Sequence, residues 1–218
     1  MIEHVLDRYH RVVDRIIVVV SPAIADAVAR GSIGYDVEWL VQPEPTGMLD
    51  AILIPHRTIR RLSPRYVWVT WCDQVAVTAS TVSELARRTG ADAAAAVVFP
   101  TVRQQPPYVH WVRDPGGRVV GVRQRREGDR MPQVGESDVG LFAVRADTYL
   151  DELPVYRDAA PTGEGTAERN FLPFVPWMAS RSRVETFPGR DPIEARGINT
   201  PADLAAVEAF LRSPRGGA

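Results

Sequence analysis

Apolar residues recur along the chain with two spacings, one typical of helices and one typical of buried strands. Residues 2–13 place six apolar side chains at helical spacing with charged residues between them, which predicts an amphipathic helix. Residues 15–21, RIIVVVS, form a continuous apolar run rich in β-branched residues, as expected for a strand buried on both faces of a parallel sheet. The segment that follows predicts a helix with Ser21 as N-cap, Pro22 in its first turn and Gly31 at its end.

The same alternation continues to residue 99. Further helices are predicted over residues 48–62 and 80–89, and further strands over residues 37–42, 66–72 and 93–99. Because strand and helix alternate, right-handed crossovers would place these strands in a doubly wound parallel sheet.

The pattern changes in the second half of the chain. A Pro-Gly-Gly turn at 115–117 separates two short strand-like runs, which predicts an antiparallel hairpin over Tyr108–Arg113 and Arg118–Gln124. Strands are predicted at 139–144 and 184–187, and helices at about 168–180 and after Thr200, the expected N-cap of the terminal helix. We expect one α/β domain over residues 1–212, followed by a flexible tail at 213–218.

Composition narrows the class of protein. The 218 residues are 45% hydrophobic and 24% charged, enough for one large core. The net charge of −1 gives no bulk attraction to nucleic acid or to an anionic membrane, and no apolar stretch approaches the roughly 18 residues of a membrane span. Cys72 is the single cysteine, so an internal disulfide is excluded, and a cytoplasmic location is expected. Every basic residue is arginine, so no lysine is available for catalysis.

Three predicted loops leave strands at the same edge of the sheet. They hold residues 42–48, Asp73 and Asn199. In open α/β sheets ligands bind beyond the carboxyl ends of the strands, so these loops are expected to build a pocket. Carboxylate and amide oxygens are ligands that Mg²⁺ prefers, with substrate phosphates completing its coordination. Asp73 is therefore either a metal ligand or the cap of the turn that follows its strand.

Other polar residues have competing interpretations. Gln42 could read the edge of a nucleobase, and Gly47 would let the backbone approach a ligand, or the two belong to an ordinary connecting loop. The arginines of VRQRREGDR could hold phosphate, although such a run more often forms a solvated strand edge. Cys72 has no histidine placed to activate it and is expected to be a small buried thiol.

Several segments resemble those of one enzyme family. MIEHVLD resembles the helix after that family's signature loop, and VEWLVQPEPTGMLDAI resembles its base-binding segment. VWVTWCDQVAVTASTV resembles the family's strand that ends in Gly-Asp. Three later segments of the family resemble GRVVGVRQ, SDVGLFAV and GINTPADLAAVE. In these segments the chain resembles the sugar-phosphate nucleotidyltransferases, which are among the MobA-like NTP transferases. The resemblance is greatest to the uridylyltransferase domains that make UDP-N-acetylglucosamine. The resemblance implies a Rossmann-like (GT-A-type) three-layer sandwich with a mixed, mostly parallel central sheet.

The resemblance also implies a set of site residues. Asp73 and Asn199 would bind Mg²⁺, while Gln42, Gly47 and Met48 would lie at the nucleobase. The acceptor pocket would hold Val109, Gln124 and Asp138, where the uridylyltransferases have glycine, glutamate and asparagine. The implied partners are a nucleoside triphosphate and a small phosphorylated acceptor. Attack of the acceptor phosphate on the α-phosphorus would release pyrophosphate.

One part of the family pattern has no counterpart in the sequence. The family begins with a strand, a glycine-rich phosphate loop and a lysine, and Met1 aligns just after them. That strand is central to such a sheet, so two neighbouring strands are expected to lack a partner on one side. Residues upstream of a misassigned start could supply the phosphate loop, or a homo-oligomer or partner chain could supply the missing strand. The chain would otherwise be a catalytically dead nucleotide-binding or regulatory paralogue, or a GT-A glycosyltransferase.

Overall fold

The computed structural model describes residues 1–30, 34–214 and 216. The first half of the chain forms α1 (Ile2–Tyr9), β1 (Ile16–Val20), α2 (Ala25–Arg30), β2 (Val37–Val41), α3 (Met48–Leu53), α4 (His56–Leu62), β3 (Tyr66–Thr70), α5 (Ala79–Arg88) and β4 (Val97–Gln104). The second half forms β5 (Val109–Arg113), β6 (Val119–Gln124), η1 (Arg125–Glu127), β7 (Gly135–Asp138), β8 (Leu141–Arg145), η2 (Thr148–Glu152), α6 (Leu153–Ala159), α7 (Phe174–Ala179), β9 (Val184–Pro188), η3 (Pro192–Ala195) and α8 (Pro201–Leu211).

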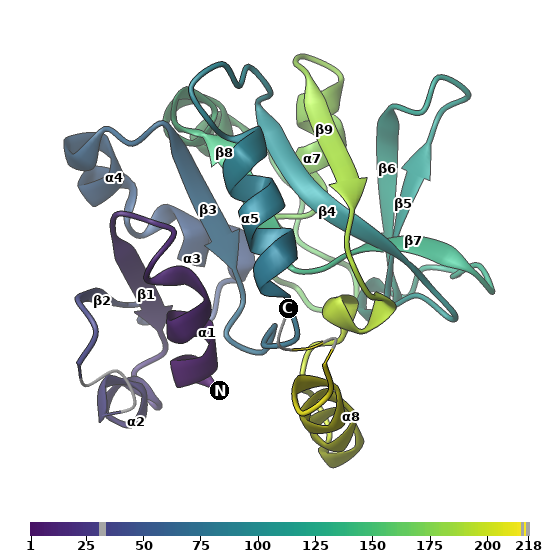
Figure 1. Cartoon of the computed structure of the whole chain (residues 1–218). Helices are drawn as coiled ribbons and strands as arrows, with labels where there is room; N and C mark the ends of the chain where they lie inside the picture. The colour runs from purple at the N-terminus through teal and green to yellow at the C-terminus, as the bar shows by residue number, and fades with distance from the viewer. Residues whose placement is uncertain (31–33, 215, 217–218) are drawn as a thin grey trace.

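A five-stranded mixed sheet lies at the centre of the molecule (Figure 1). β8 lies between β3 and β4 and is antiparallel to both, while β9 is parallel to β4 on the other side of that strand. β7 is antiparallel to the C-terminal half of β4. Strands β3, β4 and β9 therefore run in one direction, and their carboxyl ends lie at one edge. The predicted mixed sheet is confirmed, and the predicted hairpin is confirmed as β5 and β6.

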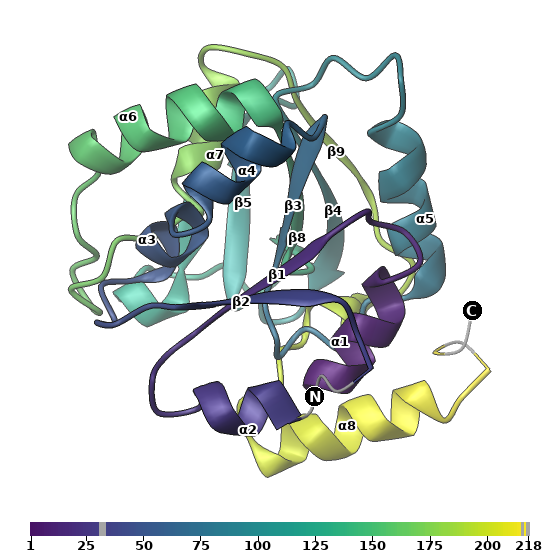
Figure 2. The same cartoon turned by 90° about the vertical axis from the view of Figure 1, so that its left-hand side faces the viewer.

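The strands of the first half do not form one doubly wound sheet, and this prediction was wrong. β1 and β2 pair in parallel as a separate two-stranded sheet beside β3 (Figures 1 and 2). Within the described residues β1 pairs only with β2, and β3 pairs only with β8. Both strands thus lack a partner on one side, as predicted. Ile16 and Ile17 of β1 nevertheless pack against the apolar clusters on the two faces of the central sheet.

Alternating side chains of β4 supply both halves of the core. Val97 and Phe99 point to one face of the sheet, and Val98 and Val102 to the other, as the two-residue period of a strand requires. The first face packs against α3, α4, α6 and α7 and holds the ring cluster Phe99, Trp111, Phe142, Phe171 and Phe174. The second packs against α1, α5 and α8.

Prolines shorten two predicted helices. The helix predicted over residues 48–62 is divided into α3 and α4, and Pro55, which has no backbone N–H to donate, stands immediately before α4. The helix predicted from residue 168 begins only at Phe174, after Pro173. Before it, Asn170 Oδ1 accepts a hydrogen bond from the Leu172 N–H at 3.0 Å, a local bond that replaces a helical one.

Two other boundaries differ from the prediction. Ser21 does not cap α2, which begins at Ala25. The predicted end of that helix, Gly31, lies outside the described residues. β4 starts at Val97 rather than residue 93, because the alanines before it have low strand propensity. η2 and α6 were not predicted, whereas the cap of α8 at Thr200 is confirmed by a capping box with Asp203.

Candidate functional site

Asp73 lies in the turn that follows β3, at the edge where the carboxyl ends of the parallel strands meet. Its side chain is partly buried, and this desolvation raises the pKa of the carboxyl group. No ion pair of this carboxylate occurs within the described residues. A Cβ atom added at Gly197 would lie only 2.5 Å from Asp73 Oδ2, so a glycine is needed where the second loop passes the carboxylate.

The loop before α8 brings Asn199 to the same place. The Ile198 N–H donates a hydrogen bond to the Asp73 carbonyl oxygen at 3.2 Å. The side chain of Asn199 is exposed, and its Nδ2 donates to the Gly197 carbonyl oxygen at 3.3 Å, while Oδ1 accepts no hydrogen bond from any described residue. Asp203 Oδ2 accepts from the Asn199 N–H at 3.3 Å and fixes the loop to the start of α8.

A buried carboxylate positions the segment that leads into this loop. Glu194, in η3, is fully buried and accepts hydrogen bonds from the Thr78 N–H at 3.1 Å and from Thr81 Oγ1 at 2.9 Å, both at the start of α5. It also accepts from the Arg190 N–H at 3.2 Å. Sequence reasoning missed Glu194, because its partners in α5 and at its cap, Thr81 and Thr78, lie more than 100 residues away in the sequence.

The donor set of Asp73 and Asn199 fits a magnesium ion that also binds phosphate. It consists of one carboxylate and one amide oxygen, both hard oxygen ligands, and among the described residues the first has no cationic partner and the second no hydrogen-bond donor. Within the described ranges no group of three or more His, Cys, Asp or Glu residues could hold a metal ion. A two-ligand arrangement would leave the remaining coordination positions to water and to substrate phosphates.

The loop after β2 contains the residues predicted at the nucleobase. Gln42 Nε2 donates to the Gly47 carbonyl oxygen at 3.1 Å, so part of this amide stabilises its own loop. Gln42 also lines a cavity of about 410 Å³ together with Thr46, Asp50 and Arg157. Met48 packs against the central core cluster.

Gly47 makes a close backbone approach, but to another segment of the protein. A Cβ atom there would lie 2.5 Å from the Arg169 carbonyl oxygen, and the φ of Gly47 is +116°. Two hydrogen bonds of 3.1 Å join the segments, from the Arg169 N–H to the Thr46 oxygen and from the Leu49 N–H to the Arg169 oxygen. The packing against Arg169 by itself explains the glycine, and the predicted ligand contact stays a prediction.

The structure pairs two of the three residues predicted to contact the acceptor and places the third, Asp138, at the end of β7, which pairs with β4. Val109 and Gln124 are paired in the hairpin of β5 and β6. Ser137 Oγ, next to Asp138, donates to the Val109 carbonyl oxygen at 2.6 Å. Asn170 Nδ2 donates to Gln124 Oε1 and ties the hairpin to the loop before α7. Sequence reasoning missed Asn170, although a polar residue directly before the apolar run FLPF was a usable signal.

Asp138 is a buried acid without a counter-ion in the described part of the chain. Its Oδ1 accepts from the Gly140 N–H at 2.8 Å. Its Oδ2 and Trp111 Nε1 are buried without a hydrogen bond of normal geometry. Burial raises the pKa of Asp138, and the facing indole N–H opposes that effect only in part.

Replacing Asp138 with asparagine is expected to stabilise the protein at pH 7. The folded-state pKa is raised above the unfolded value, so stability is greatest when the acid is protonated and is lost as the pH rises through the folded pKa. Asparagine keeps an oxygen for Gly140 and carries no charge, and we expect a gain of about 1 kcal/mol. Urea denaturation from pH 4 to 7 tests this. A variant whose stability falls with pH as steeply as the parent's would contradict the assignment.

Structural explanations account for Cys72 and also for the arginines at the end of β6 and just after it. Arg123 and Arg125 donate to the carbonyl oxygens of Arg130 and Pro107, and Arg126 pairs with Glu168, so the run stabilises loops. Cys72 is exposed, which corrects the expected buried thiol. Its pKa is raised, chiefly by desolvation and also by Asp73, which disfavours a nucleophilic thiolate.

Known proteins resemble the chain in sequence and in fold. The sequence profile of a family described as "MobA-like NTP transferase domain" matches residues 1–134. The chain is 26% identical over 221 residues to "Bifunctional protein GlmU" of Solibacter usitatus (strain Ellin6076), in an alignment that covers 97% of this chain and 45% of that protein. The chain thus spans less than half of that relative's length.

A solved structure has a similar fold. It is described as "Crystal structure of HddC from Yersinia pseudotuberculosis", and it matches with a TM-score of 0.60 over 95% of this chain and 82% of that one. At 16% identity the likeness concerns the fold alone. As for membranes, none of the helices in the described residues is long and apolar enough to cross one.

Proposed function

The chain belongs to the family of MobA-like NTP transferase domains, and from this premise we propose that it is a magnesium-dependent nucleotidyltransferase for a small phosphorylated acceptor. An acceptor phosphate oxygen would attack the α-phosphorus of a nucleoside triphosphate. The new P–O bond forms as the bond from the α-phosphorus to the bridging oxygen breaks, and pyrophosphate leaves with that oxygen.

The observation that carries the proposal is the contact between Asp73 and the loop of Asn199. Two segments 126 residues apart present a carboxylate and an amide oxygen at the sheet edge where α/β proteins bind ligands. Asp73 and Asn199 would hold the ion, which when bound would neutralise charge on the phosphates. Catalysis of this type depends mostly on positioning and electrostatic stabilisation.

The acceptor would bind between the hairpin and β7. Gln124, held by Asn170, offers an amide that can orient a hydroxyl group of the acceptor. Asp138 stands where the related uridylyltransferases have asparagine, so we expect the preferred acceptor to differ from N-acetylglucosamine 1-phosphate. A sugar 1-phosphate with a different substituent pattern is the class we would test first.

Pyrophosphate release by the purified chain tests the proposal. The assay combines each of the four common nucleoside triphosphates with a panel of sugar 1-phosphates, with magnesium or with excess EDTA. We expect release that requires one triphosphate, one acceptor and the metal. Release without an acceptor, or release unchanged by EDTA, would contradict the proposed reaction.

One observation favours a second candidate, a nucleotide-binding module without turnover. The sequence contains no lysine, and Arg123 and Arg125, at the end of β6 and just after it, are engaged in loop contacts rather than free for a triphosphate. This candidate predicts saturable nucleotide binding in calorimetry with no pyrophosphate release from any combination in the panel.

A further inference from the structure

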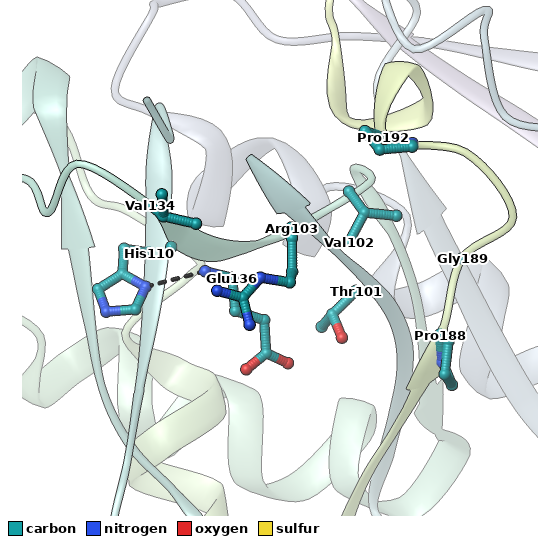
Figure 3. Close-up of a pocket in the computed structure, with 10 residues that line it drawn as sticks. Thr101, Val102, Arg103, His110, Val134, Glu136, Pro188, Gly189 and Pro192 are labelled. Atoms are coloured by element: carbon teal, nitrogen blue, oxygen red, sulfur yellow. Dashed lines mark hydrogen bonds between the residues drawn. The ribbon is translucent and has the colours of Figure 1, made fainter. Parts of the chain in front are cut away.

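The segment that joins β9 to α8 is tied to the central sheet before it reaches Asn199. The Gly189 N–H donates a hydrogen bond to the Thr101 carbonyl oxygen at 2.8 Å. Further along, Gln104 Nε2 donates to the Pro192 carbonyl oxygen. Figure 3 shows this segment along one side of a cavity, with Gly189 and Pro192 labelled on it and Thr101 on β4. The path that leads to Asn199 is therefore set by contacts with β4.

Glu194 joins this segment to the one that leaves Asp73. Glu194 lies five positions before Asn199, and Thr78 lies five positions after Asp73. The Thr78 N–H, at the N-cap of α5, donates to Glu194 Oε1 at 3.1 Å. At the other end of the same two segments, the Ile198 N–H donates to the Asp73 carbonyl oxygen at 3.2 Å. Two short segments are thus joined at both ends, so a change at Glu194 alters the contact beside Asp73.

The hydrogen bonds around Glu194 require a carboxylate. Thr81 Oγ1 lies 2.9 Å from each carboxylate oxygen, and the Arg190 N–H donates to Oε2 at 3.2 Å. A Cβ atom at Gly189 would lie only 2.8 Å from Oε2, so the chain passes very close to the carboxylate. A glutamine would place an NH₂ group at one of these positions, and that group cannot accept a hydrogen bond. The negative charge also lies at the N-terminal end of α5, where the helix dipole stabilises it.

We propose that Glu194 is a positioning residue for the metal ligands: it holds the Asn199 amide in register with the Asp73 carboxylate and thereby sets the affinity of this pair for magnesium. This role rests on the proposed function. Glu194 is fully buried and acts through the loop, not by touching the ion. Residues that orient metal ligands contribute measurably to metal affinity. The Asn199 side chain is exposed, so its position depends on the backbone that Glu194 anchors.

Titration with MgCl₂ alone, followed by NMR of the backbone amides, tests this role without any turnover. We expect Glu194→Gln to weaken magnesium binding about tenfold. In an Asn199→Ala background the same change should cause no further loss, because both substitutions act on one ligand. Tyr66→Phe is the control. It removes the 2.7 Å hydrogen bond from Tyr66 to the Ala95 carbonyl oxygen, which starts from the other end of β3, and should leave the affinity unchanged.

Hydrogen exchange of the Ile198 amide, measured without any ion, reports on the same coupling. We expect Glu194→Gln to speed this exchange about tenfold more than that of the β3 amides, because local opening of the loop becomes easier. Thr81→Val is a second variant that serves if Glu194→Gln fails to fold. It removes one hydroxyl donor to Glu194 and should act in the same direction, whereas Thr81→Ser keeps the hydroxyl and should match the parent.

The outcomes separate this role from the proposed function. Magnesium shifts that are equal in the parent and in Asp73→Asn would overturn both the metal site and the role of Glu194. Binding that is lost in Asp73→Asn but unchanged in Glu194→Gln would overturn the role of Glu194 alone. The same conclusion would follow from a further loss of affinity in the Asn199→Ala background, or from Ile198 exchange that rises no more than that of β3.

Discussion

Replacing Asp73 with asparagine is expected to reduce magnesium-dependent turnover by about 100-fold or more and, at the same time, to raise the melting temperature at pH 7. Under the proposed function the variant loses the anionic oxygen that holds the ion. The variant gains folding stability, because burial raises the pKa of Asp73 and the charged carboxylate therefore destabilises the folded state. A purely structural cap would show the opposite pattern, with turnover retained and stability lowered.

The pH dependence of metal use gives an independent measurement on Asp73. Magnesium binds the ionised carboxylate, so the apparent affinity for the ion should fall as the pH decreases through the raised pKa. Asp92→Asn is the control, because Asp92 is exposed. Unchanged turnover in Asp73→Asn, or an equal loss in both variants, would remove Asp73 from the mechanism.

The convergence of Asp73 and Asn199 was predictable from sequence because it follows from topology. Asp73 follows a recognisable apolar strand, and Asn199 precedes a capped helix. The carboxyl ends of parallel strands share one edge of the sheet. The pairing of the sheet was less predictable. β8 takes the place beside β3, and this depends on contacts between distant segments that local periodicity does not encode.

Residues whose role depends on a distant partner were missed or only partly understood. Asn170 holds Gln124, and Glu194 holds the start of α5 through Thr78. Local spacing indicates neither of these partners. Local breaks such as Pro55 were in principle readable, because proline lacks the N–H that a continuous helix needs.

Gly47→Ala is expected to destabilise the protein by about 3 kcal/mol or more. Gly47 has φ +116° and ψ 171°, a region of backbone conformation that is nearly restricted to glycine. The added methyl group would also meet the Arg169 backbone at 2.5 Å. The segments would have to separate, which breaks the hydrogen bonds that Arg169 makes with Thr46 and Leu49.

Gly117→Ala separates backbone strain from the clash. Gly117 also has a positive φ, +81°, but a Cβ atom there would meet nothing within 4 Å. We expect this control to cost only about 1–2 kcal/mol. Urea denaturation of both variants gives the difference, which contains the clash with Arg169 and the additional backbone strain at Gly47. Equal losses would mean that the two segments separate without cost, and the loop would then be free to move toward a bound nucleotide. A larger loss in Gly47→Ala means instead that the loop carrying Gln42 is held in place before any ligand binds.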